Sequence, residues 1–262
     1  MTRLEINGVE VLVEGEGSES IVMIHGWPDT YRVWDAQAAF FSRGYRCVRF
    51  TLPGFDIDKP RRAVPLEEMI ETLKAIVEQA CPGEKVILML HDWGCAFGYQ
   101  LAMRHPSLVS KIVGVDIGDA GTRQHLHSLT AKAKAMVLAY QLWLATAWRI
   151  GGRIGDWMTL WMARRARCPS DPRYIDSRMD YPYYNTWFKS QAHEMVRFEP
   201  RWPLLFIYGS RKPFMFHSPS WAKALPLRQG SETQAFDTGH WVMSQQPERF
   251  NQAVEAWLRS VS

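Results

Sequence analysis

The 262-residue sequence has no Gly-x-Ser-x-Gly motif, which argues against the serine nucleophile of common esterases. It also has no apolar run of the roughly 20 residues that a transmembrane helix needs, and its start, Met1–Glu5, shows no signal-peptide pattern. The four cysteines have no CxxC spacing, which favours reduced thiols. We therefore expect a cytoplasmic protein without stable membrane insertion, bound metal or cofactor.

Basic residues are concentrated in the middle of the chain. Between Arg123 and Glu199 there are twelve Lys/Arg and six Asp/Glu, although the net charge of the whole chain is only +4. No basic-aromatic motif accompanies them, so nucleic acid is not an expected partner. A solvated helical surface is the simpler interpretation, and attraction to acidic substrates or to a membrane surface is the alternative. The sequence leaves a homodimer open.

The hydrophobic pattern predicts an α/β fold. Alternating residues around Asn7-Gly8 indicate a β-hairpin over residues 4–13. Short apolar runs, separated by helical patterns such as 66–80 and 97–104, indicate buried parallel strands over residues 20–24, 46–51, 85–90, 111–116, 204–208 and 233–236. No strand pattern occurs for about eighty residues after Asp119. We therefore expect a helical cap over residues 121–200, inserted between core segments 1–120 and 201–262.

An aspartate follows one of these strands where a sharp strand-to-helix turn is expected. The apolar run 86–90 leads into His91-Asp92-Trp93-Gly94, and a helical pattern follows. This is the pattern of a nucleophile elbow with a carboxylate in place of serine. A carboxylate nucleophile attacks saturated carbon and forms an alkyl ester on the enzyme.

Two further motifs fall at strand ends and could converge on Asp92. His25-Gly26-Trp27-Pro28 follows the strand ending near residue 24, and Gly239-His240-Trp241 follows the last strand. With these three motifs in this order, the chain resembles the α/β-hydrolase superfamily over essentially its whole length. It is most similar to the aspartate-nucleophile branch of epoxide hydrolases and haloalkane dehalogenases. The resemblance implies a mostly parallel eight-stranded sheet, covered by helices on both faces, with an inserted cap.

The resemblance assigns a role to each motif. Asp92 would attack an epoxide carbon, and His240 would activate the water that hydrolyses the resulting ester. The backbone N–H groups of Trp27 and Trp93 would stabilise the oxyanion. The acid partner of His240 departs from the family pattern, because Lys212 stands where many epoxide hydrolases have an aspartate. Asp116, at the end of the preceding core strand, is then the favoured acid.

Asp119 is the alternative acid.

Two cap tyrosines supply the proton for the epoxide oxygen in the family. Here Tyr140 is the early candidate, and Tyr183 or Tyr184 is the late one, ahead of Tyr181.

The remaining predicted site residues would contact an apolar epoxide. Of the loop residues His25 and Pro28, the histidine is expected mainly to hold the oxyanion loop by hydrogen bonding. The cap would contribute three tryptophans, Trp143, Trp148 and Trp187.

Two alternatives to an epoxide hydrolase remain open. A haloalkane dehalogenase would use the same nucleophile, with Trp93 as one halide donor. Position 27 is less favourable for the second donor, although Trp143 or Trp148 could substitute. A catalytically silent α/β-hydrolase that binds an apolar ligand is the other, suggested by the lysine at position 212.

Overall fold

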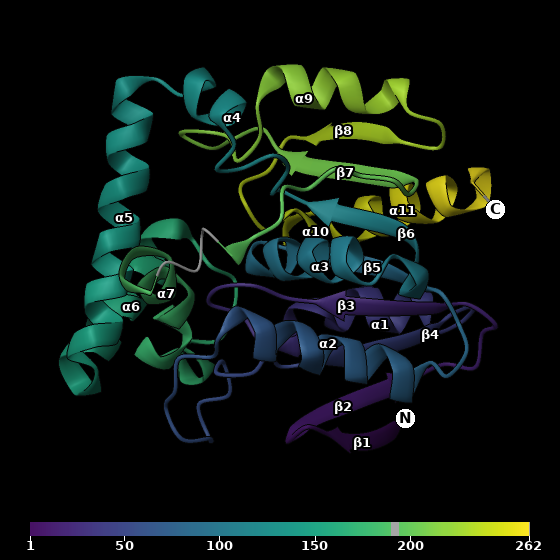
Figure 1. Cartoon of the computed structure of the whole chain (residues 1–262), viewed down its shortest axis with the longest axis horizontal. Helices are drawn as coiled ribbons and strands as arrows, with labels where there is room; N and C mark the ends of the chain where they lie inside the picture. Colours follow the sequence, from purple (N-terminus) through teal and green to yellow (C-terminus); the bar gives the residue numbers. More distant parts are fainter. Residues whose placement is uncertain (190–193, 262) are drawn as a thin grey trace.

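The computed structural model describes residues 1–189 and 194–261 and contains a central eight-stranded sheet (Figure 1). The strands in chain order are β1 (Thr2–Ile6), β2 (Val9–Glu14), β3 (Ser20–Ile24), β4 (Arg46–Phe50), β5 (Val86–His91), β6 (Val109–Val115), β7 (Leu204–Gly209) and β8 (Glu232–Phe236). Their order across the sheet is β1-β2-β4-β3-β5-β6-β7-β8. The β1–β2 and β2–β4 pairs are antiparallel and all others are parallel, which confirms the predicted sheet.

The initial hairpin forms because Asn7 and Gly8 both adopt positive φ, 49° and 73°, as a two-residue hairpin turn requires. The core strands β3 and β5 are buried along their whole length, because helices cover both faces of the sheet.

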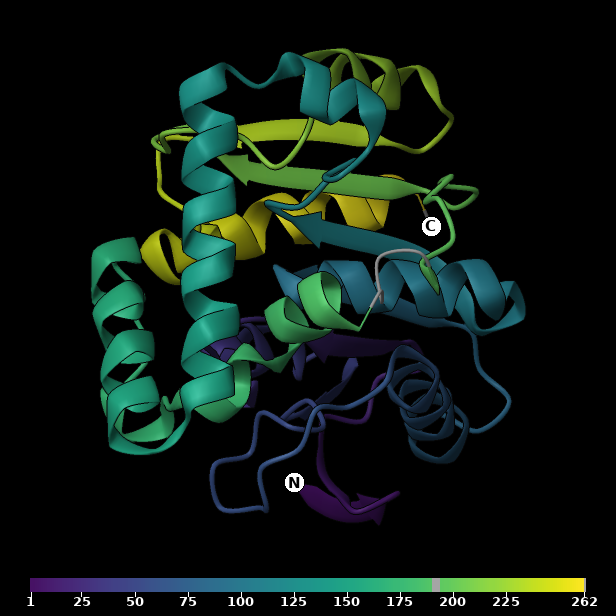
Figure 2. The same cartoon turned by 60° about the vertical axis from the view of Figure 1, so that its left-hand side comes forward.

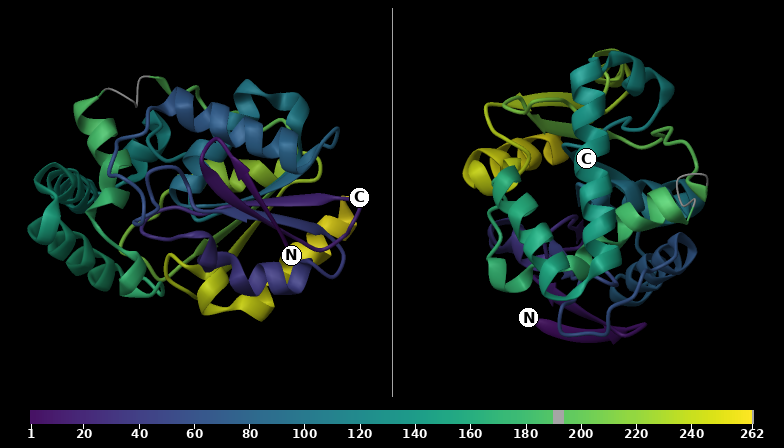
Figure 3. Two further views of the ribbon diagram at one scale, coloured as in Figure 1. Left: turned by 90° about the horizontal axis from the view of Figure 1, so that it is seen from below. Right: turned by 90° about the vertical axis from the view of Figure 1, so that its left-hand side faces the viewer.

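Helices cover the sheet on both faces (Figures 1 and 3). One face packs against α2 (Leu66–Ala80) and α3 (Trp93–Arg104), and α9 (Pro219–Ala224) also contributes there. The other face packs against α1 (Asp35–Phe41), α10 (Val242–Gln245) and α11 (Pro247–Ser260). The predicted helix began at residue 97, but α3 begins four residues earlier, at Trp93, directly after Asp92.

The segment between β6 and β7 is helical and stands over the carboxyl ends of the parallel strands (Figures 1 and 2). We call residues 121–200 the insertion. It contains α4 (Arg123–Ser128), α5 (Ala131–Ile150), α6 (Gly152–Ala166) and α7 (Tyr181–Phe188), with a short 3-10 turn at Ser177–Asp180. Among residues 1–189 and 194–261, no helix is long and apolar enough to cross a membrane.

Candidate active site

Asp92 lies at the sharp turn between β5 and α3. Its φ of 51° and ψ of −122° are strained for a residue with a side chain. Glycines make the turn possible: a Cβ at Gly94 would lie 2.2 Å from the carbonyl oxygen of Ile24, and one at Gly26 would lie 2.5 Å from the Cβ of Asp92. The small residues of both motifs therefore allow the elbow and the loop after β3 to approach each other closely.

That loop places a backbone donor on the Asp92 carboxylate. The N–H of Trp27 donates to Asp92 Oδ1 at 2.7 Å. Trp93 is the first residue of α3, so its N–H has no acceptor within the helix. His25 holds the loop: its Nε2 accepts the N–H of Leu52 at 2.9 Å, while Nδ1 lies 2.9 Å from the carbonyl oxygen of Gly26. Burial lowers the pKa of His25 to about 4, which keeps this ring neutral.

His240 lies between two carboxylates. Its Nε2 is 3.3 Å from Asp92 Oδ2, and its Nδ1 is 2.5 Å from Asp116 Oδ2. Burial disfavours the imidazolium, but the two carboxylates outweigh it and raise the pKa of His240 to about 9. Burial alone would raise the pKa of Asp92, and the contacts with His240 and Trp27 instead lower it. At neutral pH the pair is therefore an imidazolium and a carboxylate.

Asp116 follows β6 directly, with a φ of 72°, and is fully buried. Its Oδ1 accepts the N–H of Gly209 at 3.1 Å and pairs with the ammonium of Lys212. Burial opposes ionisation, but Lys212 and His240 outweigh it and lower the pKa of Asp116 strongly. The lysine in the place of the family's aspartate thus supports a carboxylate that comes from a different strand.

The alternative acid, Asp119, has other partners. Its oxygens accept from the backbone and hydroxyl of Ser218, at 2.6 and 2.7 Å, and from the hydroxyl of Thr122 at 3.1 Å. The structure therefore brings Asp116, and not Asp119, into contact with His240.

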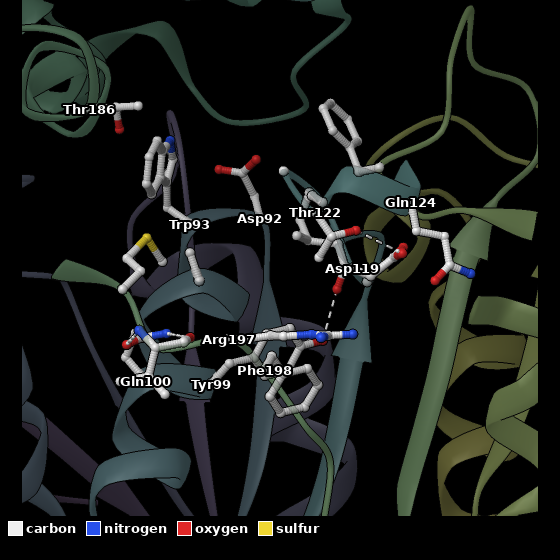
Figure 4. A pocket seen from close by; sticks show the side chains of 18 of the residues that line it. Asp92, Trp93, Tyr99, Gln100, Asp119, Thr122, Gln124, Thr186, Arg197 and Phe198 are labelled. Carbon is white, nitrogen blue, oxygen red and sulfur yellow. Dashed lines mark hydrogen bonds between the residues drawn. The ribbon is translucent and has the colours of Figure 1, made fainter. Parts of the chain in front are cut away.

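Asp92 faces a cavity of about 910 Å³ between the sheet and the insertion. In Figure 4 its carboxylate projects into this space, with Trp93 on one side and Thr122 and Asp119 on the other. Tyr140, from α5, and Tyr183, from α7, line the same cavity, and their ring centroids lie 6.0 Å apart at 82°. Burial raises the pKa of both tyrosines, and the charge of Asp92 raises them further, so both hydroxyls stay protonated.

Comparison with known families gives the same fold. The model of the alpha/beta hydrolase family matches residues 21–253, which is most of the chain. The chain belongs to the alpha/beta hydrolase family.

Several relatives of this alpha/beta hydrolase carry more specific names. Epoxide hydrolase 1 of Caenorhabditis elegans is 22% identical over 263 residues, which cover 91% of this chain and 64% of the relative. The chain thus spans less than two thirds of the length of the first curated relatives it matches.

Solved structures agree on the fold. An epoxide hydrolase from Bacillus megaterium, bound to its diol product, superposes with a TM-score of 0.75 at 18% identity, covering 98% of this chain and 100% of that one. A haloalkane dehalogenase from Bradyrhizobium elkanii gives 0.73 at 16%, covering 99% and 96%.

Tyr184 does not share the position of Tyr183, and its predicted place in the site is corrected. The two are consecutive on α7, and consecutive helical residues point about 100° apart. Tyr183 faces the cavity. The ring of Tyr184 instead stacks on those of Trp148 and Phe188, with ring centroids 4.2 and 5.5 Å apart.

The predicted substrate contacts of three tryptophans are also corrected. The indole N–H of Trp143 donates to the carbonyl oxygen of Met158, and its ring packs against α6. Trp148 packs against Tyr184. Trp187 is 44% exposed, and its indole N–H donates to the side chain of Gln141. These side chains connect helices of the insertion to each other.

The loop residues His25 and Pro28 likewise lie outside the cavity. His25 is fully buried and does not line the cavity, and Pro28 lines a separate, smaller pocket.

Asp180 was missed by the sequence interpretation. It is fully buried and accepts from the indole N–H of Trp27 at 2.6 Å and from the hydroxyl of Thr159 at 2.5 Å. It therefore ties the loop after β3 to the insertion, three residues before Tyr183. Its position beside the tyrosine cluster was the only signal, since nothing in the sequence pairs it with Trp27.

Proposed function

We propose that this alpha/beta hydrolase opens epoxides to vicinal diols through a covalent alkyl ester on Asp92. One arrangement carries the proposal: a carboxylate at a strained elbow, with the His240 imidazole and the Trp27 N–H on its two oxygens and two protonated tyrosines in the same cavity. The similarity to proteins named epoxide hydrolases supports it.

The first step is displacement at an epoxide carbon. Asp92 Oδ2 attacks, because Oδ1 is held by Trp27, and the carbon–oxygen bond of the ring breaks. The leaving alkoxide takes a proton from Tyr140 or Tyr183, whose raised pKa values keep the donor protonated until oxygen develops charge. The product of this step is an alkyl ester on Asp92.

Ester formation prepares His240 for the second step. The negative charge of Asp92 helps to raise the pKa of His240 to about 9, and that charge disappears when the ester forms. The pKa of His240 then falls, so the ring gives its proton, through solvent, to the tyrosinate left by the first step and becomes a general base for water. Water attacks the ester carbonyl, and the oxyanion develops on Oδ1, where the Trp27 N–H already lies. Collapse breaks the bond from the carbonyl carbon to Oδ2, the diol oxygen takes the second proton of the attacking water, and Asp92 is again a carboxylate beside a protonated His240.

The cavity favours an apolar substrate near the reacting atoms. Trp93, Tyr183, Ile117 and Phe216 line the cavity together with Asp92, and the insertion acts as a cap that supplies the tyrosines. The same tyrosine pair favours an epoxide oxygen over a halide as the leaving group, because a halide needs no proton.

An oxygen-18 experiment tests the proposal. With enzyme in excess over styrene oxide in labelled water, the first diol should contain an unlabelled oxygen from Asp92, and the diol formed after further additions of epoxide to the same enzyme should carry label. The His240→Gln variant should accumulate the ester, visible as added mass, and Asp92→Asn should not. Label in the first diol would reject the covalent route. Halide release from a bromoalkane without epoxide turnover would support the dehalogenase alternative, and inactivity on both would support a ligand-binding role.

A further inference from the structure

Two helices of the insertion expose large apolar residues to solvent. Three are on α6: Ile154, Trp157 and Trp161 are 64%, 58% and 44% exposed. With about 100° of rotation per residue, they fall on one side of the helix within an arc of about 120°, together with its exposed arginines. The opposite side of α6, which includes Thr159 and Ala163, is buried.

The α5 helix lies beside α6 (Figures 2 and 3) and also exposes apolar residues. Leu138 and Leu142 are 44% and 37% exposed on α5, whereas Tyr140 and Gln141 of the same helix line the cavity. Trp143 joins the two helices, with its ring 5.1 Å from that of Trp161. We call the exposed apolar residues on these two helices the outer face: Leu138, Leu142, Ile150, Ile154, Trp157 and Trp161.

The outer face is bordered by positive charge. The segment 131–166 has six basic residues and one acidic residue, Asp156. The Asp156 carboxylate accepts from the backbone and hydroxyl of Ser177, so it turns away from the outer face. The exposed Arg153, Arg164 and Arg165 have no ion pair with any residue in the described parts of the chain.

We propose that the outer face docks on the surface of an anionic phospholipid bilayer. Tryptophan and aliphatic side chains beside arginines on a helical surface match the interfacial region of a membrane, where the rings enter the headgroup layer and the cations meet lipid phosphates. A second copy of the chain fits less well, because a symmetric contact would bring two sets of unpaired arginines together. If the proposed function holds, docking leaves only α5 between the cavity and the lipid phase, in which an apolar epoxide dissolves.

Vesicle binding tests this without any turnover. The protein is sedimented with vesicles of phosphatidylcholine alone, or with phosphatidylglycerol added, at low and high salt. We expect binding that needs phosphatidylglycerol and weakens at high salt. Each basic residue near such a surface contributes roughly fivefold to binding. The variant Arg153→Gln/Arg164→Gln/Arg165→Gln should therefore bind about 100-fold less well, and Trp157→Ser/Trp161→Ser should also lose binding.

The matched control removes three other exposed basic residues: Arg43→Gln/Lys85→Gln/Arg228→Gln. These residues lie at the amino ends of β4, β5 and β8, away from the insertion. The control should bind like the unaltered protein.

Equal loss in the control, or no preference for phosphatidylglycerol, would overturn the proposal. So would a dimer in sedimentation velocity that the tryptophan variant dissolves, because the outer face would then be a self-association surface. Activity on a water-soluble epoxide is measured separately, so failure of docking and failure of the proposed reaction are distinguishable.

Discussion

Replacing Asp92 with asparagine should lower the pKa of His240, because it removes the charge that ester formation also removes. Asparagine keeps the shape of the side chain and its acceptor for the Trp27 N–H. It therefore isolates the electrostatic contribution of the carboxylate to the histidine.

The distance between the two groups sets the size of the effect. His240 Nε2 lies 3.3 Å from Asp92 Oδ2. Two unit charges at that distance interact by about 1 kcal/mol in water and about 5 kcal/mol at an effective dielectric constant of about 20. With about 1.4 kcal/mol per pKa unit, the pKa of His240 should fall from about 9 by at least about one unit.

The measurement is an NMR titration of the histidine rings, with the His240 signal assigned through His240→Gln. Asp119→Asn is the matched control: this carboxylate lines the same cavity but bonds to Ser218 and Thr122, so its loss should leave the His240 titration in place. An unchanged or higher pKa in Asp92→Asn would refute the switch from acid to base that ester formation is proposed to cause.

Three further predictions follow from contacts in the site. Tyr140→Phe and Tyr183→Phe should each slow ester formation at least about 10-fold in stopped-flow fluorescence, and leave ester hydrolysis unchanged, since each hydroxyl serves only the leaving oxygen; equal slowing of both steps would contradict this role. Asp180→Ala should lower the free energy of unfolding in urea by about 1–3 kcal/mol, because it leaves the buried indole N–H of Trp27 without an acceptor, whereas the Thr159 hydroxyl still has the carbonyl oxygen of Gly155 at 3.0 Å, and Asp180→Asn should lose less; a loss below about 0.5 kcal/mol would mean that the indole finds water. Gly26→Ala should abolish turnover, because its Cβ would lie 2.5 Å from Cβ and Oδ1 of Asp92 and displace that side chain, whereas Gly44→Ala, which meets open space, should be active.

The fold could be predicted from the sequence because its signals are local. Apolar runs of strand length, the Asn7-Gly8 turn and the absence of strand patterns after Asp119 each depend on neighbouring residues. The three motifs were also local, and parallel strands bring their carboxyl ends to one edge of the sheet. That geometry is enough to place Asp92, His240 and the loop after β3 near one another.

The tertiary structure decided everything that depends on the direction of a side chain. Asp116 and Asp119 are three residues apart, and only the path of the chain after β6 shows which one reaches His240, 124 residues away. Tyr183 and Tyr184 are adjacent, so helix rotation alone separates a cavity residue from a packing residue. A tryptophan suits both the wall of an apolar cavity and the contact between two helices, so the residue type of Trp143, Trp148 and Trp187 could not show which place each one occupies. Sequence periodicity identifies elements and their buried faces, whereas long-range packing determines which atoms meet.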